Sequence, residues 1–204
     1  MKLYKFRPLG DKEHLKRIKD IINKGFYCCD FLEFNDMNEG VYIINPKNKN
    51  IDLSTKQKYK ICSFSGINAL NSQLMWGHYA NTGMGVVIEI DVENCSEIKQ
   101  VRYNDSSDNL NTIKEILTRK SKEWKYEDEY RYLTTKNISQ EKAKVKIGKI
   151  SKIYFGTPYK NLNNYEEIKE KHKSLKKYHK LQKQLRTFGS RNSIVFEDYE
   201  FKFK

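Results

Sequence analysis

A run of eight residues, Met84–Asp91 (MGVVIEID), restricts the fold of this chain more than any other segment. It is largely apolar and β-branched, which is typical of a buried strand, and the turn sequence Asn81-Thr82-Gly83 precedes it. Alternating or apolar patterns predict further strands at residues 2–7, 26–29, 59–64, 98–103, 128–133, 151–155 and 193–203. Long βαβ runs are absent, so the sequence favours an α+β fold with a mixed, mostly antiparallel sheet flanked by helices.

Helical patterns lie between these strands. Asp11 is a suitable N-cap for a helix that runs to about Asn23, and Gly25 is placed to end it. Further helices are predicted over residues 68–79 and 110–117, the second capped by Asp108, and residues 45–58 are predicted as an exposed loop.

The sequence predicts one domain over residues 1–204, because no Pro/Gly/Ser-rich linker divides it and its length suits a single core. Residues 1–160 form the predicted core of this domain. Residues 161–204 add a closing strand and a long basic helix, predicted from Tyr165 to about Thr187. The apolar side of that helix carries Ile168, Leu175, Tyr178, Leu181 and Leu185, and lysines cover the rest.

The formal net charge of +13 is high for a chain of this length. It favours an anionic partner, such as a dinucleotide, RNA, DNA or an acidic protein. The N-terminus lacks the apolar stretch of a secretion signal, and no window approaches a membrane span, so we expect a cytoplasmic protein. The four cysteines and four histidines show no metal-ligand spacing, so no metal site is predicted.

The segment Trp124–Tyr132 (WKYEDEYRY) concentrates acidic, aromatic and basic residues. Read as an extended chain, it would point Glu127 and Glu129 the same way, and both could share a pocket near Arg131. A carboxylate pair held against an arginine suits catalysis. The alternative is a half-buried strand in which Glu129 and Arg131 form a structural ion pair.

Three other segments place polar side chains where a scaffold alone would favour apolar ones. Arg7 ends the first strand, Ser63 and Ser65 end a later one, and Trp76-Gly77-His78-Tyr79 lies on a predicted helix. Each has a structural alternative: strand-end serines often hydrogen-bond the backbone, and a histidine between helix and sheet is often only a packed residue. Asn35, Asp36 and Glu39 are explained most simply as a polar turn.

Taken together, these blocks resemble a large family of bacterial and phage domains of unknown function. The resemblance covers about three-quarters of the chain, residues 3–156, and departs from the family at Met37, where proline is usual. It implies no established activity. The matching blocks are Tyr4–Leu9, Phe34-Asn35-Asp36 with Glu39, Cys62–Ser65, Leu74–Ala80, Gly85–Asp91 and Trp124–Arg131.

The order of arginine, Ser-x-Ser and Glu-x-Glu is also similar, more distantly, to the arginine–serine–glutamate pattern of ADP-ribosyltransferases, although the spacing here is compressed. That resemblance implies NAD as a substrate, with Arg7 on its phosphates or ribose. Ser63 and Ser65 would shape the nicotinamide-ribose pocket, and Trp76 or Tyr79 would stack on a base. Arg131 would complete the binding residues.

In the same resemblance, Glu129 would bind the ribose 2′-hydroxyl and stabilise the oxocarbenium-like transition state, while Glu127 orients or deprotonates the acceptor. The first hypothesis is therefore an ADP-ribosyltransferase or NAD glycohydrolase that acts in phage–host conflict as a defence protein or toxin, with a cognate inhibitor or antitoxin. The second is a non-catalytic nucleic-acid-binding protein that uses lysines of residues 169–183. A third is a nuclease that uses His78 with Asp36 or Glu39.

Overall fold

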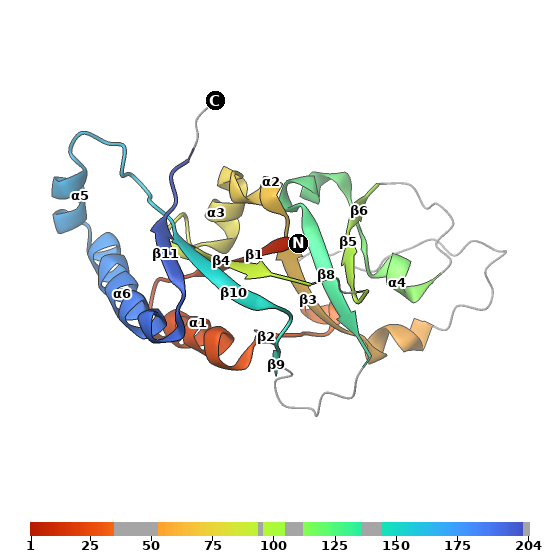
Figure 1. The fold of residues 1–204 in the computed structure, drawn as a ribbon. Helices are drawn as coiled ribbons and strands as arrows, with labels where there is room; N and C mark the ends of the chain where they lie inside the picture. Colours follow the sequence, from red (N-terminus) through yellow and green to blue (C-terminus); the bar gives the residue numbers. More distant parts are fainter. Residues whose placement is uncertain (35–52, 94–95, 105–111, 136–143, 202–204) are drawn as a thin grey trace.

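A computed structural model describes residues 1–34, 53–93, 96–104, 112–135 and 144–201. A seven-stranded sheet crosses the molecule in the order β11-β10-β4-β1-β3-β8-β5, with neighbours antiparallel except for the parallel pair β10–β11 (Figure 1). This confirms the predicted α+β class. The strands are β1 (Lys2–Pro8), β3 (Lys60–Ser65), β4 (Gly85–Asp91), β5 (Ile98–Gln100), β8 (Glu129–Thr134), β10 (Lys149–Phe155) and β11 (Val195–Asp198).

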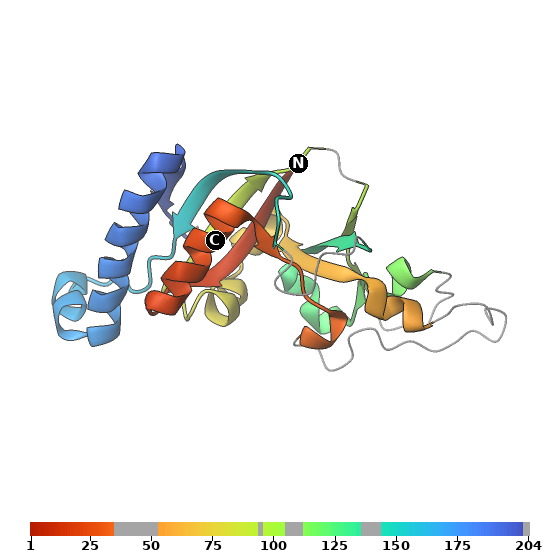
Figure 2. The ribbon, with the colours of Figure 1, turned by 90° about the horizontal axis from the view of Figure 1, so that it is seen from below.

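The two faces of the sheet carry different helices. Helices α1 (Lys12–Lys24) and α6 (Lys173–Gly189) cover one face side by side, as the view from below shows (Figure 2). The short helices α2 (Ile67–Leu70) and α3 (Gln73–Tyr79) lie on the other face. Two-stranded ladders join β2 (Phe26–Tyr27) to β9 (Lys144–Val145) and β6 (Arg102–Tyr103) to β7 (Arg119–Lys120).

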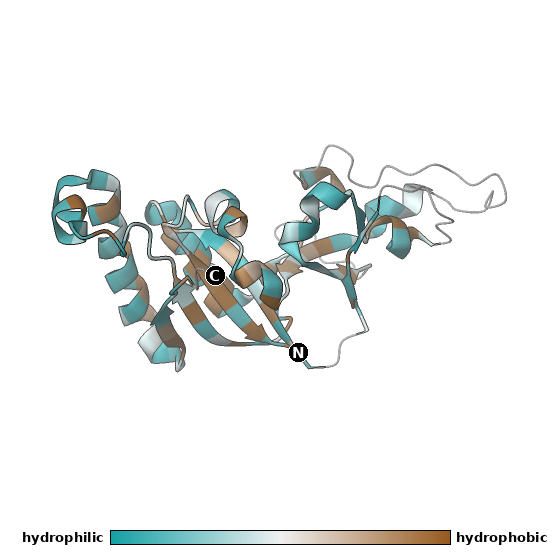
Figure 3. Cartoon of the chain, turned by 90° about the horizontal axis from the view of Figure 1, so that it is seen from above, coloured by the Kyte–Doolittle hydropathy of each residue, from teal (hydrophilic) through white to brown (hydrophobic). Residues whose placement is uncertain are grey.

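Strand β4 is buried between these helical layers, as its sequence predicts. Val86, Ile88 and Ile90 pack toward α1 and α6, while Val87 packs toward α2 and α3, because alternate residues of a strand face opposite sides. The hydropathy colouring shows apolar residues concentrated in the central strands, whereas α5 (Tyr165–Lys171) and α6 are largely hydrophilic outside (Figure 3).

Helix α1 begins and ends where the sequence indicates. The Asp11 side chain accepts a hydrogen bond of 2.8 Å from the backbone N–H of His14, which satisfies one unpaired donor of the first turn. Gly25 follows the helix with a φ of 99°, a conformation that glycine adopts without the steric cost of a Cβ atom.

Several predicted helix and strand boundaries are wrong, mainly because a segment predicted as one element forms two. The long basic helix breaks at His172 into α5 and α6, and the helix at 68–79 divides into α2 and α3 at Asn71 and Ser72. Thr112 rather than Asp108 caps α4 (Ile113–Ile116). Asp108 and the polar turn at Asn35, Asp36 and Glu39 lie outside the described residues.

The described residues also form four 3₁₀ helices: η1 (Phe31–Glu33), η2 (Leu53–Lys58), η3 (Lys122–Glu127) and η4 (Ser190–Asn192). Helix η2 falls in the segment predicted as a loop. The strand predicted at 98–103 separates into β5 and β6, and the closing strand is shorter than predicted.

The sheet is split between β1 and β3. Strand β1 pairs with β4 over seven residues but with β3 only at Tyr4–Ser65. If that register continued, Arg7 would lie opposite Cys62, yet the two strands form no further ladder. The gap leaves strand-edge polar groups and side chains available to line a pocket.

Candidate functional site

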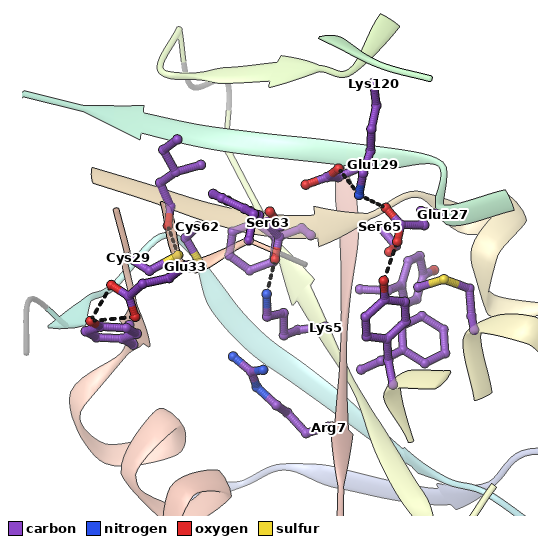
Figure 4. Close-up of a pocket in the computed structure, with 18 of the residues that line it drawn as sticks. Lys5, Arg7, Cys29, Glu33, Cys62, Ser63, Ser65, Lys120, Glu127 and Glu129 are labelled. Carbon is purple, nitrogen blue, oxygen red and sulfur yellow. Dashed lines mark hydrogen bonds and ion pairs between the residues drawn. The ribbon is translucent and has the colours of Figure 1, made fainter. Parts of the chain in front are cut away.

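A pocket of about 550 Å³ lies at the split between β1 and β3 (Figure 4). Its walls come from β1, β3, α3, the segment after α1, and the region from β7 to the start of β8. The volume is in the range typical of small-molecule and cofactor sites. One side of the pocket is cationic, and the other carries paired carboxylates.

Lys5 and Arg7 form the cationic side, and both extend from β1 into the split. The Lys5 ammonium donates a hydrogen bond to the carbonyl oxygen of Ser63, bridging the gap that the strands leave. Among the described residues, the Arg7 guanidinium has neither a hydrogen-bond partner nor an ion-pair partner, while its backbone pairs with β4. Burial lowers the pKa of both groups, although an arginine stays charged. A partly desolvated guanidinium without a carboxylate is suited to bind an anion.

Glu127 and Glu129 form the opposite side, where Lys120 lies between them. The Lys120 Nζ is 2.6 Å from Glu127 Oε2 and 3.4 Å from Glu129 Oε2. Tyr79 donates its hydroxyl hydrogen to Glu127 Oε1 at 2.5 Å. Arg131 holds Glu129 in a bidentate ion pair, with Nε–Oε1 at 2.8 Å and Nη2–Oε2 at 3.0 Å.

Glu129 is ionised at neutral pH despite its burial. Burial raises the pKa of this carboxyl group, but the charges of Arg131 and Lys120 and the Arg131 hydrogen bonds lower it to about 2. The Glu129–Arg131 ion pair that the sequence offered as a structural alternative is therefore present. It does not remove Glu129 from the pocket, whose wall includes this residue.

A sharp turn, rather than one extended segment, brings the two glutamates together. Glu127 ends η3, Asp128 adopts a left-handed conformation with φ of 45°, and Glu129 begins β8. Gly66 packs against this turn: its N–H donates to the Asp128 carbonyl at 2.7 Å, and a Cβ here would lie 2.2 Å from Asp128 Oδ2. The expected extended geometry is wrong, but the two carboxylates still meet, at Lys120.

Ser63 and Ser65 both line the pocket. The Ser63 hydroxyl lies near the Glu129 carboxylate and helps to lower its pKa. However, this oxygen is buried and has no partner with hydrogen-bond geometry among the residues that the structure describes. A buried hydroxyl without a partner is uncommon, because leaving it unsatisfied costs about 1–3 kcal/mol. A ligand in the pocket could satisfy it.

Three predicted site residues lie away from the pocket lining. Trp76 is in the core, 2% exposed, and its indole N–H donates to the carbonyl oxygen of Leu70 at 2.9 Å. His78 is exposed on α3 with Nδ1 3.1 Å from the Tyr126 hydroxyl. Arg131 is fully buried behind Glu129. Met75 and Trp76 are the buried residues of α3. Of the α3 residues that the sequence predicted for the site, only Tyr79 lines the pocket.

Sequence reasoning missed Lys5 and Lys120. Lys5 has a usable signal, because it shares a strand face with the apolar Leu3, where a scaffold would rarely place a lysine. Lys120 has no such signal in the sequence, because its lysine-rich surroundings are typical of an exposed segment. In the structure it is 5% exposed, and its Nζ lies 4.5 Å from the Trp124 ring centroid. Only the tertiary fold identifies it.

Among the described residues, no group of three or more His, Cys, Asp or Glu side chains could hold a metal ion, and no helix is long and apolar enough to cross a membrane. Comparisons with known proteins add no relative: no protein-family model, curated protein or solved structure matches the chain. The proposal that follows therefore depends on the geometry of the pocket and on the sequence resemblance.

Proposed function

We propose that this protein binds NAD in the split-sheet pocket and cleaves its nicotinamide–ribose bond, as an ADP-ribosyltransferase or NAD glycohydrolase. One observation carries the proposal. The split between β1 and β3 brings Arg7, the Ser63 hydroxyl and the Glu127–Glu129 pair to a single pocket. The family of bacterial and phage domains that the sequence resembles stays a prediction, as does the role of the protein in phage–host conflict.

The charge distribution orients such a substrate. Its pyrophosphate fits the cationic side, where Arg7 offers a bidentate donor and Lys5 a second positive charge. The nicotinamide ribose would then lie toward Glu127 and Glu129. Heterolysis of the C–N bond leaves positive charge on the sugar, and a fixed carboxylate opposes that charge without reorganising.

The two glutamates have different freedom to act. Glu129 is held on both oxygens by Arg131, so it serves as a fixed anion and an acceptor for a ribose hydroxyl. Glu127 is held by Tyr79 and by Lys120, which also contacts Glu129. Lys120 can therefore keep one carboxylate neutralised while the other engages the substrate or the acceptor. The acceptor is water, a protein or a nucleic acid.

We expect Glu127→Gln to lower NAD turnover about 100- to 1,000-fold, the range seen when one electrostatic contact to a transition state is removed. The measurement is nicotinamide release by mass spectrometry, with RNA, DNA or lysate added as acceptors. Glu127→Gln is a cleaner test than Glu129→Gln, because changing Glu129 also removes the charge that the fully buried Arg131 guanidinium binds with two hydrogen bonds.

Glu89→Gln is the matched control. Glu89, on β4, is also a buried carboxylate, 2% exposed and bonded to Lys2, Ser151 and Tyr154, but it lies outside the pocket lining. Its variant should keep wild-type turnover. If Glu127→Gln and wild type release nicotinamide at the same rate, or if the wild-type protein neither binds nor cleaves NAD with any acceptor, the proposal is wrong.

The charge of α6 favours a second candidate function, binding of nucleic acid without catalysis. Four exposed lysines of this helix, Lys173, Lys177, Lys180 and Lys183, form no ion pair among the described residues. By contrast, Lys169, Lys171 and Lys176 pair with glutamates of α5. Glutamates therefore neutralise part of the positive charge of this surface, and the four lysines without an ion pair supply the rest.

If α6 binds phosphates, changing those four lysines together to glutamine should weaken binding and flatten its salt dependence. The slope of log K against log salt should fall by about 0.9 for each phosphate of duplex DNA that the variant no longer neutralises. Fluorescence anisotropy over a salt series measures both quantities. The control changes Lys169, Lys171 and Lys176 to glutamine and should have a smaller effect. Equal effects, or salt-independent binding, would exclude this α6 surface.

A further inference from the structure

Cys28 and Cys62 lie opposite each other on antiparallel segments. Cys29 and Ile61 exchange both backbone hydrogen bonds, of 2.9 and 2.8 Å. The next pair along, Cys28 with Cys62, is therefore a non-hydrogen-bonded pair, in which Cα atoms are typically about 4.5 Å apart and the side chains are close. Disulfides span Cα separations of about 4.4–6.8 Å, so the backbone already suits a cross-strand bond.

The two cysteines belong to the same buried cluster but differ in their position relative to the pocket. Both cysteines are free thiols, 2% exposed and part of the same apolar cluster, and the two thiols influence each other's ionisation. Only Cys62 of the two lines the pocket (Figure 4). A small reagent that enters the pocket thus meets Cys62 first, with Cys28 behind it.

The pocket cations favour the charged form of Cys62. Burial raises the pKa of this thiol, but the hydrogen bond from Cys28 and the charges of Lys5 and Arg7 lower it below its ordinary value. The neighbouring Cys29 faces a different environment: its Sγ donates to the Ile61 carbonyl at 3.5 Å, and burial raises its pKa to about 11. The two pocket cysteines are thus expected to differ in reactivity.

We propose that Cys62 and Cys28 form an oxidation site that converts reversibly to a cross-strand disulfide, with peroxide as the oxidant. The Cys62 thiolate attacks one peroxide oxygen, giving a sulfenic acid and releasing hydroxide. The Cys28 thiol then attacks the Cys62 sulfur, forming the S–S bond and releasing water. The two thiols lose two electrons, and one peroxide gains them.

This disulfide would change the pocket without displacing its backbone. It joins the segment after α1 to β3 and removes the ionisable Cys62 thiol from the wall that faces Lys5 and Arg7. The cationic side of the pocket would then attract anions more strongly. This site is independent of whether NAD is the substrate.

The test is treatment of the purified full chain with hydrogen peroxide, alkylation of the remaining thiols, and peptide mapping without reduction. We expect a Cys28–Cys62 cross-linked peptide with a mass lower by two hydrogens, which a thiol reductant reverses. Cys28→Ser should instead stop at the Cys62 sulfenic acid, detected with a dimedone probe. Arg7→Gln should slow the reaction severalfold, because the Cys62 thiolate loses a neighbouring cation.

Cys29→Ser is the matched control, because it removes the adjacent thiol and should leave the rate and yield of the cross-link unchanged. A thermal melt of each variant confirms that it is folded before oxidation. A disulfide that forms mainly through Cys29 or between chains would overturn the proposal. So would peroxide treatment that leaves Cys28 and Cys62 as free thiols in the folded wild-type protein.

Discussion

Arg131→Met is expected to lower the free energy of unfolding by about 3–5 kcal/mol, because it leaves Glu129 as a buried charge without its main partner. Arg131 is 0% exposed and binds both oxygens of Glu129 as well as the carbonyl oxygen of Leu117, at 2.6 Å. Urea unfolding followed by circular dichroism measures the difference. As a control, Arg17→Met removes the exposed Arg17–Glu13 pair and should cost less than about 1 kcal/mol.

The stability of this variant should also depend on pH differently from that of the wild type. The Glu129 carboxyl has a pKa of about 2 in the folded protein against 4.5 ordinarily, so its stabilising contribution is complete above 4.5 and is lost as pH falls toward 2. Without Arg131, the largest part of that contribution is lost, and only the smaller effect of Lys120 and Ser63 remains. The gap in stability between wild type and Arg131→Met should therefore narrow as the pH falls through this range.

If the difference in stability between wild type and Arg131→Met stays constant from neutral pH to pH 2, the ionised Glu129 does not cause the loss of stability in this variant. A double variant, Glu129→Leu with Arg131→Met, provides a further check. Replacing both members of a buried pair with apolar side chains is often close to neutral, so this variant should recover much of the stability that Arg131→Met removes. Double-mutant analysis then isolates the coupling between the two residues.

Trp76→Ala is the second substitution for which we expect a large effect, a decrease of about 3–5 kcal/mol in the free energy of unfolding. Trp76 is 2% exposed and contacts the rings of Phe6, Tyr199 and Phe201, with centroids 5.5, 5.2 and 5.8 Å away. Its removal opens a cavity where α3 meets the sheet and also removes the hydrogen bond to Leu70. Urea unfolding by circular dichroism again provides the measurement.

The chain offers its other tryptophan as the control. Trp124 is only half-buried, so Trp124→Ala should be less destabilising than Trp76→Ala. This pair separates a core role for Trp76 from the stacking role that the sequence resemblance implies. If Trp76→Ala keeps wild-type stability and selectively loses nucleotide affinity, the core assignment is wrong.

Local chemistry is enough to predict some parts of this protein from its sequence. Helix α1 has its cap at Asp11, its stop at Gly25 and an apolar stripe, and these features need no distant partner. Strand β4 carries apolar residues on both faces, which favours burial wherever the strand lies. Residue type also singled out Arg7, Ser63 and the Glu127–Glu129 pair, because such residues at strand ends are unusual for a scaffold.

Which of those residues meet depends on the tertiary structure alone. The split between β1 and β3 depends on pairing between segments about sixty residues apart, and local periodicity carries no information on where a ladder stops. Whether Trp76 or Tyr79 reaches the pocket depends on how α3 is rotated against the sheet, and a seven-residue helix fits several rotations. Lys120 lies between two buried glutamates because distant elements enclose it, and so the centre of the candidate site follows from packing.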